Sequence, residues 1–239
     1  MTQSPVSTGG HAHSLPQVPS LCMMTLLCAS VCIAAPAQKS FVLKPGIDGL
    51  TLIGSKAEAT EYRGKKAVHL SQAPGGGESM ALVNDLDFKN GTIELEIAGA
   101  PSAGASEGAR GFVGIAFRMG ADGKHFECVY LRPTNGRADD QLRRNHSTQY
   151  VSAPDYPWER LRKENPGVYE SYVDQEAGAW TKYKLVVNGS KAALYINGAE
   201  QPCLIINDLK GTEGHGKVAL WIGPEADGYF SGLKVTAAP

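Results

Sequence analysis

The chain has 239 residues, a formal net charge of −1 and 42% hydrophobic residues. This length suits one large β domain or two small ones, and the hydrophobic content is ordinary for a globular core. The near-neutral charge argues against a generally basic protein that binds nucleic acid. The 28 glycines are typical of a chain with many turns between short elements.

The N-terminal segment has the pattern of an export signal. An apolar run, LCMMTLLCASVCIAAPA, covers residues 21–37 and ends in Ala35-Pro36-Ala37, which has the small-x-small form of a cleavage site. The run is shorter than the roughly 20 apolar residues of a membrane span, and no Lys or Arg precedes Lys39. We predict that residues 1–37 are a signal peptide and spacer. The mature chain then has no membrane span and is periplasmic or secreted; a retained anchor and a cytoplasmic protein are the alternatives.

Two cysteines remain beyond this run, Cys128 and Cys203. An exported protein could pair them, but we favour two buried free thiols on different strands. No His or Cys spacing resembles a zinc site, and no acidic loop has the spacing of calcium ligands. We therefore expect no cofactor and no metal. Nothing in the sequence indicates the oligomeric state.

The chain from residue 38 onward reads as a series of short strands. Alternating apolar residues predict strands in residues 92–99, 112–118 and 126–132. Asn-Gly pairs at residues 188–189 and 197–198 divide residues 180–206 into three further strands, because both positions of such a turn favour a positive φ. Residues 216–223 and 229–235 supply two more strands, and residues 157–164 a short helix. Many short strands with regular turn signals predict an all-β sandwich or barrel.

In a two-sheet sandwich, each strand turns one face to the core and the other outward. We assign to the core Ile93, Leu95, Ile97, Val113, Ile115, Phe117, Val218, Leu220 and Ile222. Two kinds of outward residue remain. One is a solvated charged face of Glu94, Glu96, Lys182 and Lys184, explained by cross-strand pairing. The other combines small, basic and aromatic residues: Gly114, Ala116, Arg118, Tyr130, Arg132 and Trp221. This second face suits a sugar, or the aromatic rings of Tyr130 and Trp221 are simply covered by a long insertion at residues 133–178.

A family resemblance follows from these strands. GFVGIAFR, FECVYLRP, GAWTKYKLVVNG and the closing YFSGLKV together resemble the concanavalin A-like lectin and glucanase jelly rolls. The similarity covers residues 41–236 and is greatest to bacterial exported domains of the laminin-G-like and 3-keto-disaccharide hydrolase type. The resemblance implies an antiparallel two-sheet jelly roll that binds carbohydrate on the concave face of its larger sheet. Structural calcium occurs in some jelly rolls. The paired-carboxylate strand of many jelly-roll glucanases is missing.

Residues 133–178 are predicted to be a long irregular insertion within the domain formed by residues 38–239. A loop of this size is usually functional or disordered, and its tyrosines and Trp158 give it enough apolar surface to fold. We interpret it as a flap over the concave face. The predicted substrate-binding residues are Arg118, Tyr130, Arg132, Arg143, Arg144, Asn145, Gln149, Trp158 and Trp221. The alternative is a solvated basic loop that pairs with its own Asp139 and Asp140.

Three activities stay open. A glycoside hydrolase, acting on an ordinary or a 3-keto sugar, needs an acid and a base; Glu127 and His146 are the candidates, with Asp139, Asp140 and Asp155 in reserve. A lyase on an anionic polysaccharide would use Tyr150 or His146 as the base. A non-catalytic module would stack sugars on Trp221 and Tyr130. We favour the hydrolase, with His146, Glu127 and Tyr150 as its catalytic residues and a carbohydrate as its ligand.

Overall fold

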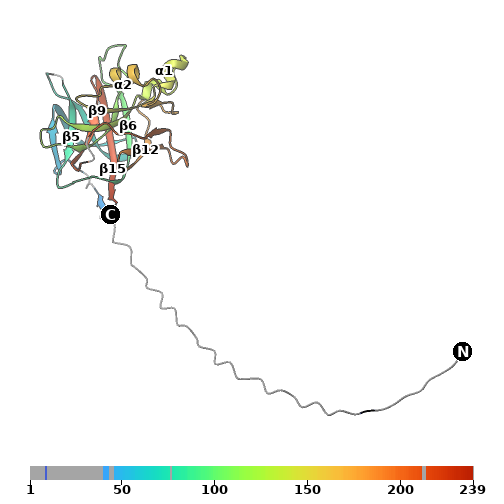
Figure 1. Ribbon diagram of the computed structural model, residues 1–239. Coiled ribbons are helices and arrows are strands. Elements are labelled where there is room, and N and C mark those ends of the chain that lie inside the picture. The colour runs from blue at the N-terminus through green and yellow to red at the C-terminus, as the bar shows by residue number, and fades with distance from the viewer. Residues whose placement is uncertain (1–8, 10–39, 43–45, 76, 212–213, 239) are drawn as a thin grey trace. The chain divides into compact units, whose positions relative to one another are not determined.

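The computed structural model describes Gly9 and residues 40–42, 46–75, 77–211 and 214–238. The chain divides into two units, Met1–Ala35 and Pro36–Pro239. All of the first unit except Gly9 lies outside the described residues. The signal-peptide prediction for residues 1–37 therefore stays a prediction. The second unit is a sandwich of two antiparallel sheets (Figure 1).

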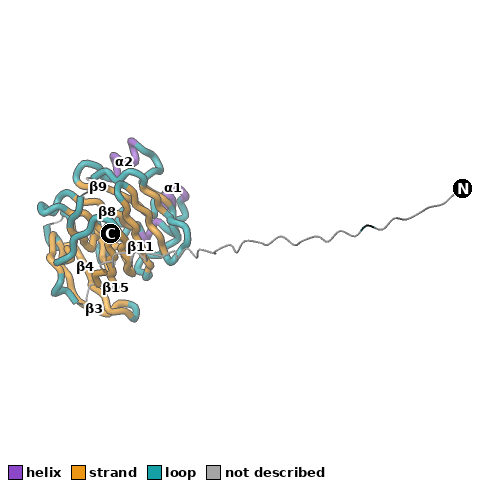
Figure 2. Tube along the Cα trace, turned by 60° about the horizontal axis from the view of Figure 1, so that its bottom comes forward, coloured by secondary structure: helices purple, strands orange, loops and turns teal. Residues whose placement is uncertain are grey.

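Sheet A has the order β13-β12-β11-β6-β15-β4-β3, with β1 also paired to β15. Its strands are β1 (Ser40–Val42), β3 (Ser55–Tyr62), β4 (Lys65–Gln72), β6 (Gly91–Pro101), β11 (Thr181–Asn188), β12 (Lys191–Ile196), β13 (Leu204–Ile206) and β15 (Ala226–Ala237). Figure 2 shows β15, β4 and β3 running side by side. The long central pair β6 and β15 joins an early segment to the C-terminal one.

Sheet B has the order β10-β9-β8-β7-β14-β5-β2. Its strands are β2 (Leu50–Ile53), β5 (Ser79–Val83), β7 (Val113–Met119), β8 (Phe126–Leu131), β9 (Thr148–Ala153), β10 (Glu170–Ser171) and β14 (Lys217–Ile222). Three short helices accompany it: the 3-10 helix η1 (Pro133–Asn135), α1 (Gln141–Asn145) and α2 (Trp158–Glu164). The two α-helices lie at one end of the sandwich (Figure 1).

The inward faces form one core, as the alternation predicts. All nine residues assigned to the core from the sequence are buried in a single cluster. The predicted turn at residues 197–198 is confirmed, since Asn197 has φ 54° and Gly198 has φ 77°. These are the positive φ angles that the Asn-Gly pair tolerates. The turn begins a longer connection, because β12 ends at Ile196 and the antiparallel β13 begins only at Leu204. The all-β two-sheet prediction is therefore confirmed.

Sheet B also carries a second apolar layer on its outer face. This outer cluster consists of Met80, Ala116, Met119, Phe126, Cys128, Tyr130, Ala219 and Trp221, all of them buried. Because both faces of the sheet are covered, every residue of β7 and β8 is buried. The alternation in these strands therefore separates two apolar layers, and not an apolar face from a solvated one.

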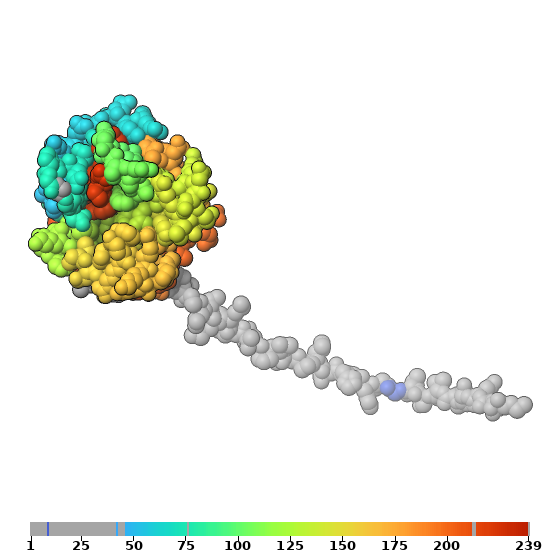
Figure 3. All heavy atoms as spheres, turned by 90° about the horizontal axis from the view of Figure 1, so that it is seen from above, coloured from blue at the N-terminus to red at the C-terminus, as the bar shows by residue number. Residues whose placement is uncertain are grey.

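The segment predicted as an irregular insertion, residues 133–178, contains two strands of sheet B. β9 pairs with β8 over its whole length, and β10 pairs with β9. The irregular part is thus limited to η1, α1, α2 and their connections. In Figure 3 the α1 segment (yellow-green) and the α2 segment (yellow-orange) lie on one side of the unit, with the loop before β7 (green) next to the α1 segment. The insertion is an extension of the sheet and not a separate flap.

Cys128 and Cys203 are both free, as predicted. Cys128 is buried on the outer face of β8, also as predicted. Cys203 is only half-buried and directly precedes β13, so the prediction of a buried thiol on a strand is wrong for this residue. Among the residues that the structure describes, no group of three or more His, Cys, Asp or Glu side chains is arranged to hold a metal ion. Within the same residues, no helix has the length and apolar character needed to cross a membrane.

Candidate functional site

One row of side chains crosses the outer face of sheet B from edge to edge. Successive cross-strand partners are Ile53, Met80, Trp221, Gly114, Tyr130, Gln149 and Glu170. Cross-strand partners share a face, so all seven point to the same side. The row changes from aliphatic through aromatic to polar, and its polar end lies at the short edge strand β10.

Gly114 lets two aromatic rings meet in the middle of this row. A Cβ atom at Gly114 would lie 2.6 Å from the Cβ of Tyr130, so only glycine fits there. The rings of Trp221 and Tyr130 pack over it with centroids 4.9 Å apart, and Trp221 Nε1 donates a hydrogen bond to Glu78 at 2.8 Å. The two residues are only 8% and 3% exposed. Both rings are buried in the outer cluster, whose buried residues all come from strands outside residues 133–178.

Arg132 links the aromatic part of the row to its polar end. Its Nη2 donates to the Tyr130 hydroxyl at 3.2 Å and to Gln149 Oε1 at 3.1 Å. Its guanidinium carbon lies 5.4 Å from the Tyr130 ring and 5.6 Å from the Trp158 ring, which is cation–π distance. Burial raises the pKa of Tyr130 to about 12, against the lowering effect of Arg132. The phenol therefore stays protonated and contributes a fixed hydroxyl.

Glu170 is a buried carboxylate surrounded by cationic side chains. Arg162 binds it in bidentate fashion, with Nε 2.9 Å from Oε1 and Nη2 2.6 Å from Oε2. Arg132 Nη1 lies 3.7 Å from Oε2. His146 Nδ1 also lies 2.8 Å from Oε2, but not at the angle of a hydrogen bond. A bidentate guanidinium–carboxylate pair is a strong, directional contact, so it fixes both side chains at this edge.

The side chain of His146 is an uncharged imidazole at neutral pH. Burial lowers its pKa, and the nearby Arg162 and Arg132 lower it further, while Glu170 opposes them. Since the ordinary value is 6.5, the uncharged ring dominates at neutral pH. A neutral imidazole can exchange hydrogen bonds with a hydroxyl-rich ligand.

A pocket of about 670 Å³ opens at this polar end. It is lined by Leu142, Asn145, His146, Arg162, Pro166, Gly167, Glu170, Ser171 and Tyr172. Tyr172 is one of the lining residues, whereas Trp158 lies outside the lining and packs against the lining residue Arg162. Each of these two exposed rings therefore lies beside an arginine. Arg144 donates to the Tyr172 hydroxyl at 2.9 Å, with its guanidinium carbon 5.0 Å from the ring, and Arg162 lies 4.6 Å from the Trp158 ring. Tyr172 is 41% and Trp158 38% exposed.

Two of the three predicted catalytic residues lie on the other face of the sheet. Tyr150 and Glu127 point into the core, where the Tyr150 hydroxyl donates to Glu127 Oε2 at 2.5 Å. Backbone N–H groups of Gly211 and Lys210 donate to the Glu127 carboxylate and to the Tyr150 hydroxyl. Burial raises the pKa of both side chains. The prediction that His146 shares one cleft with them is therefore corrected, because alternate residues of β8 and β9 face opposite sides.

Arg118 also leaves the predicted face. Its φ is 50°, and the register between β7 and β14 shifts beside it. This β-bulge re-aims the side chain, which donates to the carbonyl oxygens of Lys89 and Gly189 and to Asn90 Oδ1. The arginine thus ties β7 to two turns of sheet A.

The remaining predicted residues divide between the pocket and its surroundings. Asn145 lines the pocket and accepts a hydrogen bond from Gln141 at 2.7 Å. Arg143 turns to η1, donating to Asn135 Oδ1 at 2.9 Å. Arg162, Glu170 and Tyr172 were missed as site residues. Their only signal in the sequence was their position in residues 133–178.

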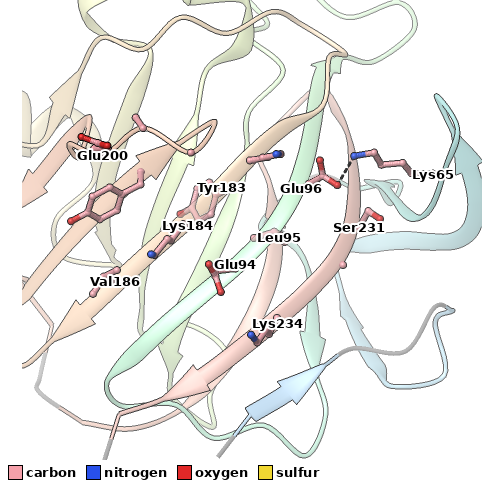
Figure 4. A pocket seen from close by; sticks show the side chains of 15 residues that line it. Lys65, Glu94, Leu95, Glu96, Tyr183, Lys184, Val186, Glu200, Ser231 and Lys234 are labelled. Carbon is pink, nitrogen blue, oxygen red and sulfur yellow. Dashed lines mark ion pairs between the residues drawn. The ribbon is translucent and has the colours of Figure 1, made fainter. Parts of the chain in front are cut away.

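A larger hollow of about 1010 Å³ lies on the outer face of sheet A (Figure 4). Its floor alternates in charge because Lys184 lies opposite Glu94, and Lys182 opposite Glu96. Lys65 Nζ lies 2.5 Å from Glu96 Oε2. Both β11 lysines are exposed, which confirms the solvated charged face. Cross-strand pairing explains these contacts.

No protein-family model and no curated protein matches the sequence, whereas solved structures match its fold. The carbohydrate-binding module CBM66 from Bacillus subtilis has a TM-score of 0.54 at 14% identity, over 78% of this chain and 95% of that one. A Bacillus subtilis protein of unknown function with a galectin-like fold has a TM-score of 0.51 at 12% identity, over 84% and 98%. The carbohydrate recognition domain of Emp46p has a TM-score of 0.50 at 14% identity, over 82% and 95%.

At sequence identities of 12–14%, these similarities show that the fold is shared and nothing beyond the fold. The chain has the concanavalin A-like jelly-roll fold that the strand patterns resemble. The narrower resemblance, to laminin-G-like and 3-keto-disaccharide hydrolase-type domains, stays a prediction.

Proposed function

We propose that this protein binds carbohydrate without cleaving it, in the pocket between α1, α2 and β10. The observation that carries the proposal is the exposed ring of Tyr172 in a pocket lined by an amide, an imidazole and a guanidinium. The exposed ring of Trp158 packs against Arg162, the arginine of the same pocket. A concave site with apolar surface and a few fixed polar groups is the usual form of a small-ligand site. Aromatic rings match the C–H faces of a sugar, while the polar groups match its hydroxyls.

The arrangement of carboxylates supports binding over hydrolysis. Glycoside hydrolysis ordinarily needs two carboxyl groups, one on each side of the scissile bond. Glu170 is the single carboxylate among the residues that line the pocket, and Arg162 already holds both of its oxygens. Glu127 lies on the opposite face of the sheet, so it supplies no second carboxylate. The hydrolase that we considered from the sequence therefore loses the carboxylate partner of His146.

The fold supports a carbohydrate as the ligand class. Two of the similar structures are a carbohydrate-binding module and a carbohydrate recognition domain.

The test is a binding screen against a glycan array, followed by affinity measurements on the best ligand. We expect Tyr172→Ala and Trp158→Ala each to weaken binding about tenfold, equivalent to about 1.4 kcal/mol, with little change in thermal stability. Trp221→Ala is the matched control: it should lower the free energy of unfolding by about 3–5 kcal/mol and leave the affinity of the folded molecule unchanged. Chromatography of long incubations should show intact glycan. New products would refute the non-catalytic proposal, and undiminished binding by both pocket variants would refute the site.

A further inference from the structure

Three arginines gather around the 3-10 helix η1, and one of them, Arg132, lies 3.7 Å from Glu170, which lines the pocket. We call Arg110, Arg132 and Arg143 the arginine cluster. Arg132 directly precedes η1. The carbonyl oxygen of Arg110 accepts a hydrogen bond from the Thr134 backbone at 3.4 Å, and Arg143 Nη2 donates to Thr134 Oγ1 at 3.1 Å. Segments before β7, after β8 and in α1 therefore bring three positive charges to one place.

Neutral acceptors take up most of the hydrogen bonds of this cluster. Arg110 Nη1 donates to the carbonyl oxygens of Glu107 and Ala109. Arg143 uses the Asn135 amide oxygen and the oxygens of Thr134. Within the described part of the chain, neither Arg110 nor Arg143 has a carboxylate oxygen within 4.0 Å. Their charges are therefore not matched by a direct ion pair.

The acidic groups nearby offset only part of this positive charge. Asp140 caps α1, where its Oδ1 accepts from the backbone N–H of Arg143 at 2.6 Å. Glu170 pairs with Arg132 at 3.7 Å, but it is shared with Arg162, which binds it in bidentate fashion. Glu107 lies near Arg110, but its effect on that side chain is smaller than the effects of the two other arginines. The cluster thus keeps an excess of positive charge.

The electrostatics of Arg110 reflect this excess. Burial lowers its pKa, and the charges of Arg143 and Arg132 lower it further. Like charges held close together disfavour the charged form of each group. An anion between them would remove the repulsion and would gain charge-assisted hydrogen bonds from planar, bidentate donors.

We propose that the arginine cluster binds an anionic substituent, a carboxylate or a sulfate, of a glycan whose sugar ring occupies the pocket. This inference rests on the proposed carbohydrate-binding function. Arg110 and Arg143 are half-buried and make the contact. Arg132 is 5% exposed, so it acts through its field and through its contact with the Trp158 ring. The protein therefore selects acidic sugars over their neutral counterparts.

The experiment uses dextran sulfate, polygalacturonate and neutral dextran, together with the best neutral ligand of the glycan array. We expect the two anionic polymers to bind more tightly than dextran, and the binding to weaken as salt rises, because salt screens charge. Arg110→Gln and Arg143→Gln should each weaken the binding of the anionic polymers about tenfold. The matched control is Arg160→Gln, an exposed arginine of α2 paired with Glu164, which removes the same charge from the surface.

Each outcome decides between the two proposals. A loss of affinity for the anionic polymers in both cluster variants, with the affinity of Arg160→Gln unchanged, supports the arginine cluster. The relative affinities for the two polymers then identify the bound group as carboxylate or sulfate. An equal loss in all three variants means general charge attraction and overturns the inference. Binding of neutral glycans only, unaffected by the cluster variants, overturns the inference and leaves the proposed function standing. Binding of no glycan at all overturns both. Thermal unfolding of each variant confirms that the comparison is made on folded protein.

Discussion

Glu127 and Glu170 are two buried carboxylates of the same sheet with opposite surroundings. Glu127, on the inner face, is held by neutral donors: the Tyr150 hydroxyl and the Gly211 backbone N–H. Glu170, on the outer face, is held by two guanidiniums. Burial raises the pKa of Glu127, because hydrogen bonds from neutral groups do not offset the loss of water.

The comparison shows that burial alone does not mark a functional carboxylate. Glu127 anchors the loop that contains Lys210 and Gly211 to sheet B, which is a structural role. Glu170 holds Arg162, and thereby the wall of a pocket, in one orientation. The sequence does not distinguish these roles, because both residues are glutamates in a β-rich part of the chain.

The largest expected effect is for Glu170→Ala. The substitution leaves the buried Arg132 and the half-buried Arg162 without their common carboxylate, and breaking a buried ion pair typically costs about 3–5 kcal/mol. Denaturant unfolding measures the loss. Glu164→Ala, which removes an exposed partner of Arg160, should change stability by less than about 1 kcal/mol. Equal effects for the two variants would show that Glu170 is no more than a surface partner.

A smaller effect is expected for Glu127→Gln. The amide keeps the acceptor for Gly211 but leaves the Tyr150 hydroxyl without one, at a cost of about 1–3 kcal/mol. The pKa of Glu127 is raised above its ordinary value of 4.5, so the folded state holds this proton more tightly than the unfolded state. The wild type should therefore exceed Glu127→Gln in free energy of unfolding by most below pH 4.5, and this difference should decrease as the pH rises through the raised pKa. Chemical unfolding of both proteins from pH 4 to 8 tests this prediction. A stability difference that increased with pH would contradict it.

The smallest expected effect is for His146→Gln. Its pKa is lowered from 6.5, so the unfolded chain takes up this proton more readily than the folded one. The wild type should lose stability relative to His146→Gln as the pH falls below 6.5 and the ring in the unfolded chain becomes protonated. Paired unfolding curves between pH 8 and 5 provide the measurement. If the free energy of unfolding changed with pH equally in the two proteins, the charge of Glu170 would fully offset the effect of burial on the pKa of the ring.

Local patterns account for the strands from β6 onward, apart from β9 and β10. The alternation in β6, β7 and β14 places Ile93, Ile115 and Leu220 in the core, and the Asn-Gly pair at Asn197 forms a turn with positive φ after β12. Strands β1 to β5 were not predicted individually. Strands β9 and β10 were not predicted either, because the apolar residues of their segment serve both faces of the sheet and leave no simple alternation. Partners far apart in sequence, such as β6 with β15, follow no local pattern.

The candidate site was predicted as a region but not as a set of contacts. The sequence by itself determined that residues 133–178 carry the chemistry-bearing side chains, since amides, arginines, a histidine and aromatic rings concentrate there. Only the tertiary structure decided which of them meet. The side to which a strand residue points depends on register and bulges: a one-residue step puts Tyr150 inside and Gln149 outside, and a bulge turns Arg118 away from Tyr130. Register is set by packing across the whole sheet, so the pairing of Glu170 with Arg162, Arg132 and His146 exists only in the folded protein.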